Sequence, residues 1–263
     1  MKIKFKIKTT EMLVTILLMA FILPLSGNTV CYGSELTAKE IVKKSQDLVR
    51  GETNYGVYEL TVKTPDWERT LTMEGWDKRP DYMFLRIINP PKEAGTTFLR
   101  IGTNMWQYIP KVERVIKFPP SMMMQSWMGS DFNNDDLVKE SSMINDYHHR
   151  VIRKDMEDGE EFYEIELLPK PDAPVVWGKI IYRVRIQDFV PLKEEFYSEK
   201  GVLKRVMHYK EIRLMDDRNI PTVIEVKSLS KPGNVTVLHI TAMQFNESFD
   251  ENIFTMRNLK NQR

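Results

Sequence analysis

The sequence predicts a mainly β protein built on one antiparallel sheet of about ten or eleven strands. Apolar and polar residues alternate in run after run along the chain, and turn signals rich in Gly, Pro, Asn and Asp separate the runs. The long helical patterns that would alternate with strands in a parallel α/β sheet do not occur in the sequence. The length of 263 residues fits a single β-rich domain.

The first 33 residues have the layout of a secretory signal peptide. Four lysines within residues 2–8 precede an apolar stretch over residues 12–25, which is shorter than the ~20 residues of a spanning helix. We expect cleavage after Gly33, which leaves residues 34–263 as one domain exported to the periplasm. An uncleaved anchor and lipid attachment at Cys31 are the alternatives, although residues 28–30 lack the small side chains of a lipid-attachment motif.

Charge and cysteine content exclude several classes of function. The chain has 38 basic and 37 acidic residues, a formal net charge of +1. Removing the leader, with its four lysines and one glutamate, changes this to 1 − 3 = −2. Such a balance gives no electrostatic case for binding nucleic acid. The mature chain would have no cysteine, so disulfides and a cysteine nucleophile are excluded.

A helix over residues 37–50 is expected to open the domain. Thr37 followed by Glu40 is a capping box, apolar residues continue at helical spacing, and Gly51 ends the pattern.

Strands dominate the rest of the chain. In the first half the patterns cover residues 58–62, 68–76, 82–88, a hairpin over 96–109, and 114–118. In the second half they cover residues 162–168, 180–186, and hairpins over 192–209 and 223–245. The strand over 82–88 is apolar on both faces, so we expect other parts of the protein to cover both of its faces.

The longest break between strand patterns covers residues 119–145. It includes most of the sequence FPPSMMMQSWMGSDF, residues 118–132, and a short helix pattern over 131–140 with Asn133 or Asn134 as its cap. A connection of this length is usually functional or disordered, and its apolar content argues against disorder. Methionine is flexible and polarizable and suits surfaces that accept varied apolar partners. From the residues alone, the methionine-rich run is either a plug that closes the core or a lid that contacts a ligand.

Metal-binding and catalytic motifs are not found in the sequence. His148 and His149 would point to opposite faces of a strand, which favours a polar edge strand over a metal site. The acidic run from Asp131 resembles a calcium loop but has Asp136 where that loop needs Gly, so a helix cap is the better interpretation. We expect no metal, no cofactor and no enzymatic activity.

Two pairs of adjacent carboxylates are candidates for a catalytic acid pair. Glu160 and Glu161, and Glu194 and Glu195, lie at the ends of strand patterns. A catalytic pair usually comes from separate strands that face one pocket. We therefore expect these four side chains to be solvated charges.

Five segments together resemble the LolA-like outer-membrane lipoprotein-sorting proteins. They are DKRPDYMFLR at residues 77–86, PPKEAGTTF at 90–98, MWQYIP at 105–110, WMGSDF at 127–132 and FTMR at 254–257. The resemblance covers residues 34–259, and the block from Pro90 to Phe132 carries it most specifically.

The resemblance implies an incomplete antiparallel β-barrel wrapped around an apolar cavity, with an N-terminal helix and short lid helices. It further implies a monomeric periplasmic carrier that binds acyl chains of lipoproteins or lipids and moves them toward the outer membrane. Its expected partners are an inner-membrane exporter and an outer-membrane acceptor. An accessory lipid-binding factor for a lipid-exporting transporter and a lipid- or lipoprotein-sensing regulatory module are the alternatives.

Two groups of residues are expected to contact the cargo. The wall residues are Phe84, Ile88, Phe98, Ile101, Trp106 and Tyr108. The lid residues are Met122, Met123, Met124, Trp127 and Met128. The resemblance also implies an arginine that ties the lid to the barrel, for which Arg86 and Arg100 are candidates because each lies within an apolar strand.

Overall fold

The computed structural model describes residues 35–138 and 142–260. The expected signal peptide and its cleavage site lie outside this part of the chain. The strands are β1 (Thr53–Lys63), β2 (Glu68–Lys78), β3 (Tyr82–Asn89), β4 (Thr97–Ile101), β5 (Asn104–Ile109), β6 (Arg114–Lys117), β7 (Tyr147–Glu157), β8 (Glu160–Pro169), β9 (Lys179–Arg185), β10 (Pro191–Tyr197), β11 (Leu203–Met215), β12 (Arg218–Ser228) and β13 (Val235–Phe245). The α-helices are α2 (Ala38–Val49), α3 (Asn134–Val138), α4 (Ser142–Asn145) and α5 (Met256–Leu259). Single 3-10 turns are η1 (Pro110–Val112), η2 (Pro120–Met122), η3 (Trp127–Gly129) and η4 (Glu251–Phe254).

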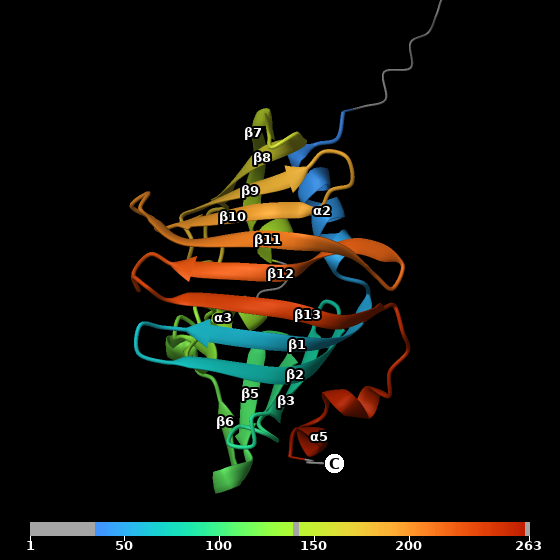
Figure 1. Cartoon of the computed structure of the whole chain (residues 1–263), viewed down its shortest axis with the longest axis vertical. Coiled ribbons are helices and arrows are strands. Elements are labelled where there is room, and N and C mark those ends of the chain that lie inside the picture. Colours follow the sequence, from blue (N-terminus) through green and yellow to red (C-terminus); the bar gives the residue numbers. More distant parts are fainter. Residues whose placement is uncertain (1–34, 139–141, 261–263) are drawn as a thin grey trace, which may run out of the picture. The chain divides into compact units, whose positions relative to one another are not determined.

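One antiparallel sheet contains all of these strands, in the order β6-β5-β4-β3-β2-β1-β13-β12-β11-β10-β9-β8-β7. Figure 1 shows the first strand, β1, beside the last, β13. The sheet has β6 and β7 as its two edges and does not close, which confirms the expected incomplete antiparallel barrel. Its thirteen strands exceed the ten or eleven expected. The strand without an expected range is the edge strand β7, whose residues are all exposed from Ile152 onward, so apolar and polar residues do not alternate there.

Helix α2 has the boundaries and the cap that the sequence predicts. The Thr37 backbone N–H donates to Glu40 Oε2 at 2.8 Å, and the Glu40 N–H donates to Thr37 Oγ1 at 3.3 Å. Ile41, Val42, Ser45 and Gln46 are buried, which places one stripe of the helix against the sheet. The helix crosses the strands from β9 to β12 (Figure 1). We call the side of the sheet that carries α2 the inner face.

The lid segment, residues 118–146, joins one edge of the sheet to the other. It leaves β6 and enters β7, and these two strands are the opposite ends of the strand order. β6 and β7 are consecutive in the chain but lie at opposite edges of the sheet. The segment that connects them therefore has to cross from one edge of the sheet to the other. Within the described residues it has turns η2 and η3 and the short helices α3 and α4, and no strand, as expected. Asp135 and Asp136 lie in the first turn of α3, where carboxylates suit the helix dipole.

The chain after β13 covers the outer face at β3 to β5. Phe84, Leu99 and Tyr108 are buried there against Phe254 of η4 and Leu259 of α5. The Thr97 hydroxyl donates to the Leu259 carbonyl oxygen at 2.5 Å. Strand β3 is therefore covered on both faces, as its sequence predicts.

The hairpin between β7 and β8 turns at Asp158 and Gly159. Both residues have positive φ, 52° and 84°, which is the backbone conformation of a type I′ turn and explains the Asp-Gly pair. Within the described part of the chain, no helix has the length and apolar character that a membrane-spanning helix needs.

Candidate ligand-binding cavity

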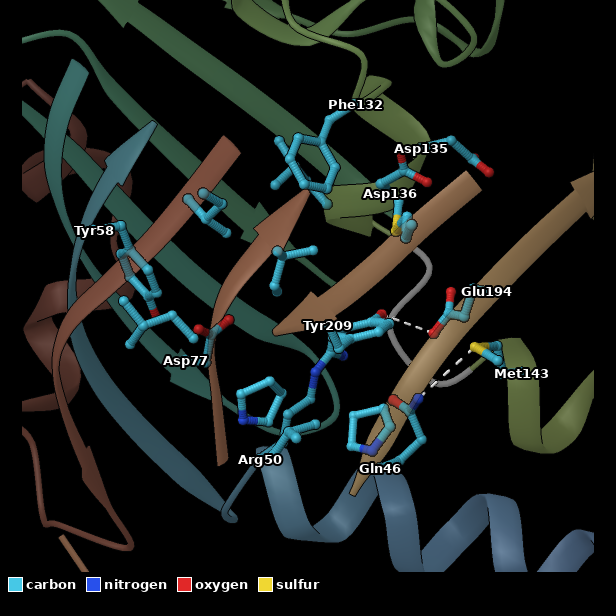
Figure 2. Close-up of a pocket in the computed structure, with 18 of the residues that line it drawn as sticks. Gln46, Arg50, Tyr58, Asp77, Phe132, Asp135, Asp136, Met143, Glu194 and Tyr209 are labelled. Atoms are coloured by element: carbon cyan, nitrogen blue, oxygen red, sulfur yellow. Dashed lines mark hydrogen bonds between the residues drawn. The ribbon is translucent and has the colours of Figure 1, made fainter. Parts of the chain in front are cut away.

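A cavity of about 350 Å³ lies between the inner face of the sheet, helix α2 and the lid segment. Figure 2 shows part of its lining, contributed by α2, by strands from both halves of the sheet and by the lid segment. The volume falls at the lower end of the ~300–1,000 Å³ range of small-molecule sites.

Apolar side chains make up most of the wall. They reach the cavity because alternate residues of each strand face the same side of the sheet. The apolar lining includes Leu60, Met73, Met83, Leu85, Val175, Val176, Trp177, Ile180, Phe196, Met207, Ile220, Ile224, Leu238, Ile240 and Met243. This wall can accept an apolar ligand from water.

The lid segment closes the cavity with aromatic and methionine side chains. Trp127 is 3% exposed, lines the cavity and packs edge-on against Phe98, with ring centroids 5.5 Å apart. Phe132 and Leu137 also line the cavity. The lid contributes its largest aromatic side chain to the boundary of the cavity.

A buried ion pair fastens the lid to the sheet. Arg205 of β11 is 3% exposed and donates from Nη1 to Asp136 Oδ2 at 2.6 Å and from Nη2 to Asp136 Oδ1 at 2.8 Å. Its Nη1 also donates to Asn133 Oδ1 at 3.1 Å. The guanidinium stacks on Phe196 and Trp177, whose ring centroids lie 4.3 and 5.0 Å away. Two-pronged geometry and stacking are contacts that arginine makes and lysine cannot reproduce.

Two further contacts hold the lid at neighbouring points. Thr236 of β13 donates from Oγ1 to Asp131 Oδ2 and accepts from the Asp131 backbone N–H, both at 2.8 Å. Arg69 of β2 donates to the carbonyl oxygen of Met128. The lid is thus tied to both halves of the sheet by polar contacts, in addition to the packing of Trp127 and Val138 in the inner core.

One end of the cavity is polar. We call this the polar pole, and it consists of Gln46, Arg50, Tyr182, Glu194 and Tyr209. The Tyr209 hydroxyl donates to Glu194 Oε1 at 2.8 Å, and the Tyr182 hydroxyl lies 2.7 Å from Ser45 Oγ. Figure 2 shows Glu194, Tyr209, Gln46 and Arg50 gathered near the end of α2.

Burial shifts the ionisation of the polar pole toward neutral forms. Burial raises the pKa of Glu194 above its ordinary value of 4.5, although the Tyr209 hydrogen bond and the charges of Arg205 and Arg50 oppose the shift. Burial also raises the pKa of Tyr209 and that of Tyr182. The expectation that Glu194 is a solvated charge is wrong, because the side chain is 4% exposed and lines the cavity. Glu160 and Glu161 are exposed, as expected.

The structure places most of the expected wall residues away from this cavity. Phe84, Ile101, Trp106 and Tyr108 face the outer side of the sheet and pack in the cluster with Phe254. Ile88 is 40% exposed. The cavity is lined instead by their neighbours Met83 and Leu85, because adjacent residues of a strand point to opposite faces. Phe98 is on the inner face, where it supports Trp127.

The expected lid residues lie together on the inner face. Met122, Met123 and Met128 are partly buried and pack against the inner core with Trp127, while Met124 is 48% exposed. Of these five, Trp127 lines the cavity.

The candidate arginines Arg86 and Arg100 bond to the first half of the sheet. Arg86 Nη1 lies 3.3 Å from Glu74 Oε1 on the adjacent strand, and Arg100 Nη1 donates to the Pro80 carbonyl oxygen at 2.8 Å. The two-pronged tie to the lid comes from Arg205. The sequence has a signal for it, since Arg205 is in phase with the buried Met207 of the same strand.

The histidine pair and the acidic run are occupied by structural contacts. His148 is exposed and His149 is half-buried on edge strand β7, with His149 Nε2 2.7 Å from the Met143 carbonyl oxygen. Asp131 and Asp136 bond to Thr236 and Arg205. The described residues contain no group of three or more His, Cys, Asp or Glu side chains placed to hold a metal ion.

Comparison with solved structures gives relatives over most of the chain. A LolA superfamily protein from Nitrosomonas europaea is 25% identical, with a TM-score of 0.72 over 85% of this chain and 100% of its own. A domain from Vibrio parahaemolyticus described as an outer membrane lipoprotein-sorting protein is 22% identical, with a TM-score of 0.73 over 85% of this chain and 98% of its own. A DUF1329 family protein from Desulfovibrio piger is 18% identical, with a TM-score of 0.78 over 84% of this chain and 97% of its own.

Family models and curated proteins give two further results. The model of a family described as "uncharacterized protein" matches residues 79–261. A comparison with curated proteins finds no match. The matched range covers more than half of the sequence and includes β3 to β13, the lid segment and Arg205. This chain therefore belongs to the family that this model describes, and its fold is that of the LolA superfamily protein from Nitrosomonas europaea.

Proposed function

We propose that this protein is a periplasmic carrier that holds acyl chains of a lipoprotein or lipid in its cavity and moves them toward the outer membrane. The observation that carries the proposal is a largely apolar cavity closed by a lid that polar contacts hold in place. It is supported by the Vibrio parahaemolyticus relative, which is described as a lipoprotein-sorting domain.

The energetics of lipid transfer require such a cavity. Each acyl CH2 exposed to water costs about 0.8 kcal/mol, so a chain of about 16 carbons costs on the order of 10 kcal/mol. A carrier has to supply an apolar wall of comparable area and still release the load. Opening the lid would separate Trp127 and Val138 from the inner core, while the strands of the sheet stay paired with one another.

The carrier role implies a donor at the inner membrane and an acceptor at the outer membrane. It needs no catalytic step, since binding and release only shift the lid between closed and open states. The lid segment joins the two edges of the sheet, so cargo that enters between the edges would displace it.

A free lipid delivered by an exporting transporter is a second candidate cargo. The volume of about 350 Å³ favours it, because that space suits a single small amphiphile better than the several chains of a lipoprotein. Both candidate cargoes would bind in this cavity, and they differ in the membrane protein that delivers them.

Binding of a fluorescent probe whose emission rises in apolar surroundings tests the carrier role. The full-length mature protein should bind the probe saturably with one site, and fatty acyl compounds should displace it. A folded protein that shows no saturable probe binding would contradict the proposal.

A further inference from the structure

The polar pole is more polar than an acyl-chain wall requires. Glu194 lies on β10 in phase with the buried Phe196, and its side chain is 4% exposed. Burying a carboxyl group is costly unless it is neutralised or fully hydrogen-bonded. A carrier of bare hydrocarbon would be better served by an apolar residue at this position.

The Glu194 carboxyl group retains hydrogen-bonding capacity inside the cavity. Its Oε1 accepts from the Tyr209 hydroxyl at 2.8 Å. Among the residues that the structure describes, none donates a hydrogen bond to Oε2. A ligand that enters the cavity can therefore donate to this oxygen.

Gln46 supplies a replaceable donor at the same pole. Gln46 is 8% exposed, lines the cavity and donates from Nε2 to the Met143 thioether at 3.8 Å. Sulfur is a weak acceptor, so an oxygen of a ligand can replace it. The pole thus offers both an acceptor and a donor to one small polar group.

On the basis of the proposed carrier role, we infer that the cargo is an amphiphile with one uncharged head group, a hydroxyl or a carboxamide, that binds at Glu194 and Gln46. Its apolar body extends toward Trp127 and Phe132 of the lid. Hydroxyl and carboxamide groups both donate and accept, which matches the two sides of the pole.

The charges at the pole exclude ionised head groups. A carboxylate or phosphate would lose its hydration in the buried site, carries no hydrogen atom to donate to Glu194, and is repelled by Glu194 whenever that group is ionised. An ammonium group would share the site with Arg50, whose positive charge already acts on Glu194, Tyr182 and Tyr209. A neutral head avoids both costs and can form a hydrogen bond with Glu194 Oε2.

Displacement of the fluorescent probe by three ligands of one chain length tests the inference. Dodecanol should displace the probe from the full-length mature protein at a concentration about tenfold lower than dodecanoate or dodecylammonium at neutral pH, which corresponds to about 1.4 kcal/mol. The charged head groups leave hydrogen bonds unmade or meet a like charge at the pole. Equal displacement by dodecanol and dodecanoate would overturn the inference and leave the carrier role standing. Failure of all three, with no probe binding, would count against the carrier role itself.

Matched variants connect the preference to Glu194. Glu194→Gln keeps the side-chain shape and should reduce the preference for dodecanol over dodecanoate at least severalfold. Glu195→Gln is the control, because Glu195 points to the other face, where it pairs with Lys193 and Tyr197. Tyr209→Phe, the second variant, removes the hydrogen bond to Glu194 Oε1 and should also reduce the preference. Melting temperatures show which variants are folded. An unchanged preference in both folded variants would contradict the assignment.

Discussion

Arg205 and Asp136 form a two-pronged ion pair that joins strand β11 to helix α3 of the lid segment. The two donor–acceptor distances are 2.6 and 2.8 Å, and the arginine is 3% exposed while the aspartate side chain is 21% exposed. The pair joins the lid to the second half of the sheet through an almost fully buried arginine.

Asp136→Asn should loosen the lid. The substitution leaves the Arg205 guanidinium buried without its counter-charge, and the expected loss in the free energy of unfolding is about 1–3 kcal/mol, below the range for a fully buried pair because Asp136 is partly exposed. Hydrogen exchange at residues 122–136 should speed up more than at β11. The control is Glu211→Gln, which breaks an exposed pair with Arg213 and should cost less than about 1 kcal/mol. Equal exchange rates in the wild type and Asp136→Asn would show that the pair does not hold the lid.

Leu238→Trp should block the cavity. Leu238 is half-buried, lines the cavity and lies opposite Ile224, so an indole there occupies space that a ligand needs. Probe affinity should fall about tenfold or more, which corresponds to about 1.4 kcal/mol. His239→Trp is the matched control, since His239 is the next residue of the strand and is exposed on the other face. Similar affinities for both variants would place the ligand elsewhere.

Glu194 should make the protein less stable as the pH rises. Its pKa in the folded state is raised above 4.5, so the folded protein holds this proton more tightly than the unfolded chain. Its contribution to stability is therefore fully present below pH 4.5 and is lost as the pH rises through the folded pKa. Glu194→Gln should remove this slope, and the measurement is the difference in urea unfolding between the two proteins from pH 4.5 upward.

Comparing the wild type with Glu194→Gln separates the contribution of Glu194 to stability from that of the histidines. Burial lowers the pKa of His149 and of His208 below 6.5, so both cost stability as the pH falls below that value. Both proteins share this contribution, which cancels in the comparison. A difference in stability that does not change with pH would contradict the raised pKa of Glu194.

Methionines of the lid should differ in their effect on stability. Met123 is partly buried against the inner core, whereas Met124 is 48% exposed. Met123→Ser should lower the free energy of unfolding by about 1–2 kcal/mol, and Met124→Ser should stay within about 0.5 kcal/mol. If Met123→Ser weakens probe binding by much more than it lowers stability, the side chain acts as part of the lid. If the substitution lowers stability without weakening probe binding, Met123 belongs to the hydrophobic core.

The architecture was largely predictable because its signals are local. The capping box at Thr37 and Glu40 fixes the start of α2, and Asp-Gly at 158–159 forms the turn that its residues favour. The lid segment was identified as the one long break between strand patterns. Edge strand β7 was harder to define, because exposed residues from Ile152 onward carry no periodicity.

The cavity lining depended on contacts that are distant in sequence. Strand β3 is apolar at Met83, Phe84 and Leu85, so its composition alone does not tell which face meets the cavity. The segment after β13 determines which face of β3 is turned away from the cavity, because Phe254 covers Phe84 on that face. Glu194 was expected to be a solvated charge and Arg205 was not singled out, although their phase with Phe196 and Met207 is the available signal that they face inward.

The most direct test of the carrier role is native mass spectrometry of the protein purified from its own cell envelope. We expect a population whose mass exceeds that of the mature chain by one lipid, and the Leu238→Trp variant should lose this population while His239→Trp keeps it. A wild-type protein that is uniformly empty, and that takes up no lipid when incubated with envelope lipids, would contradict the account.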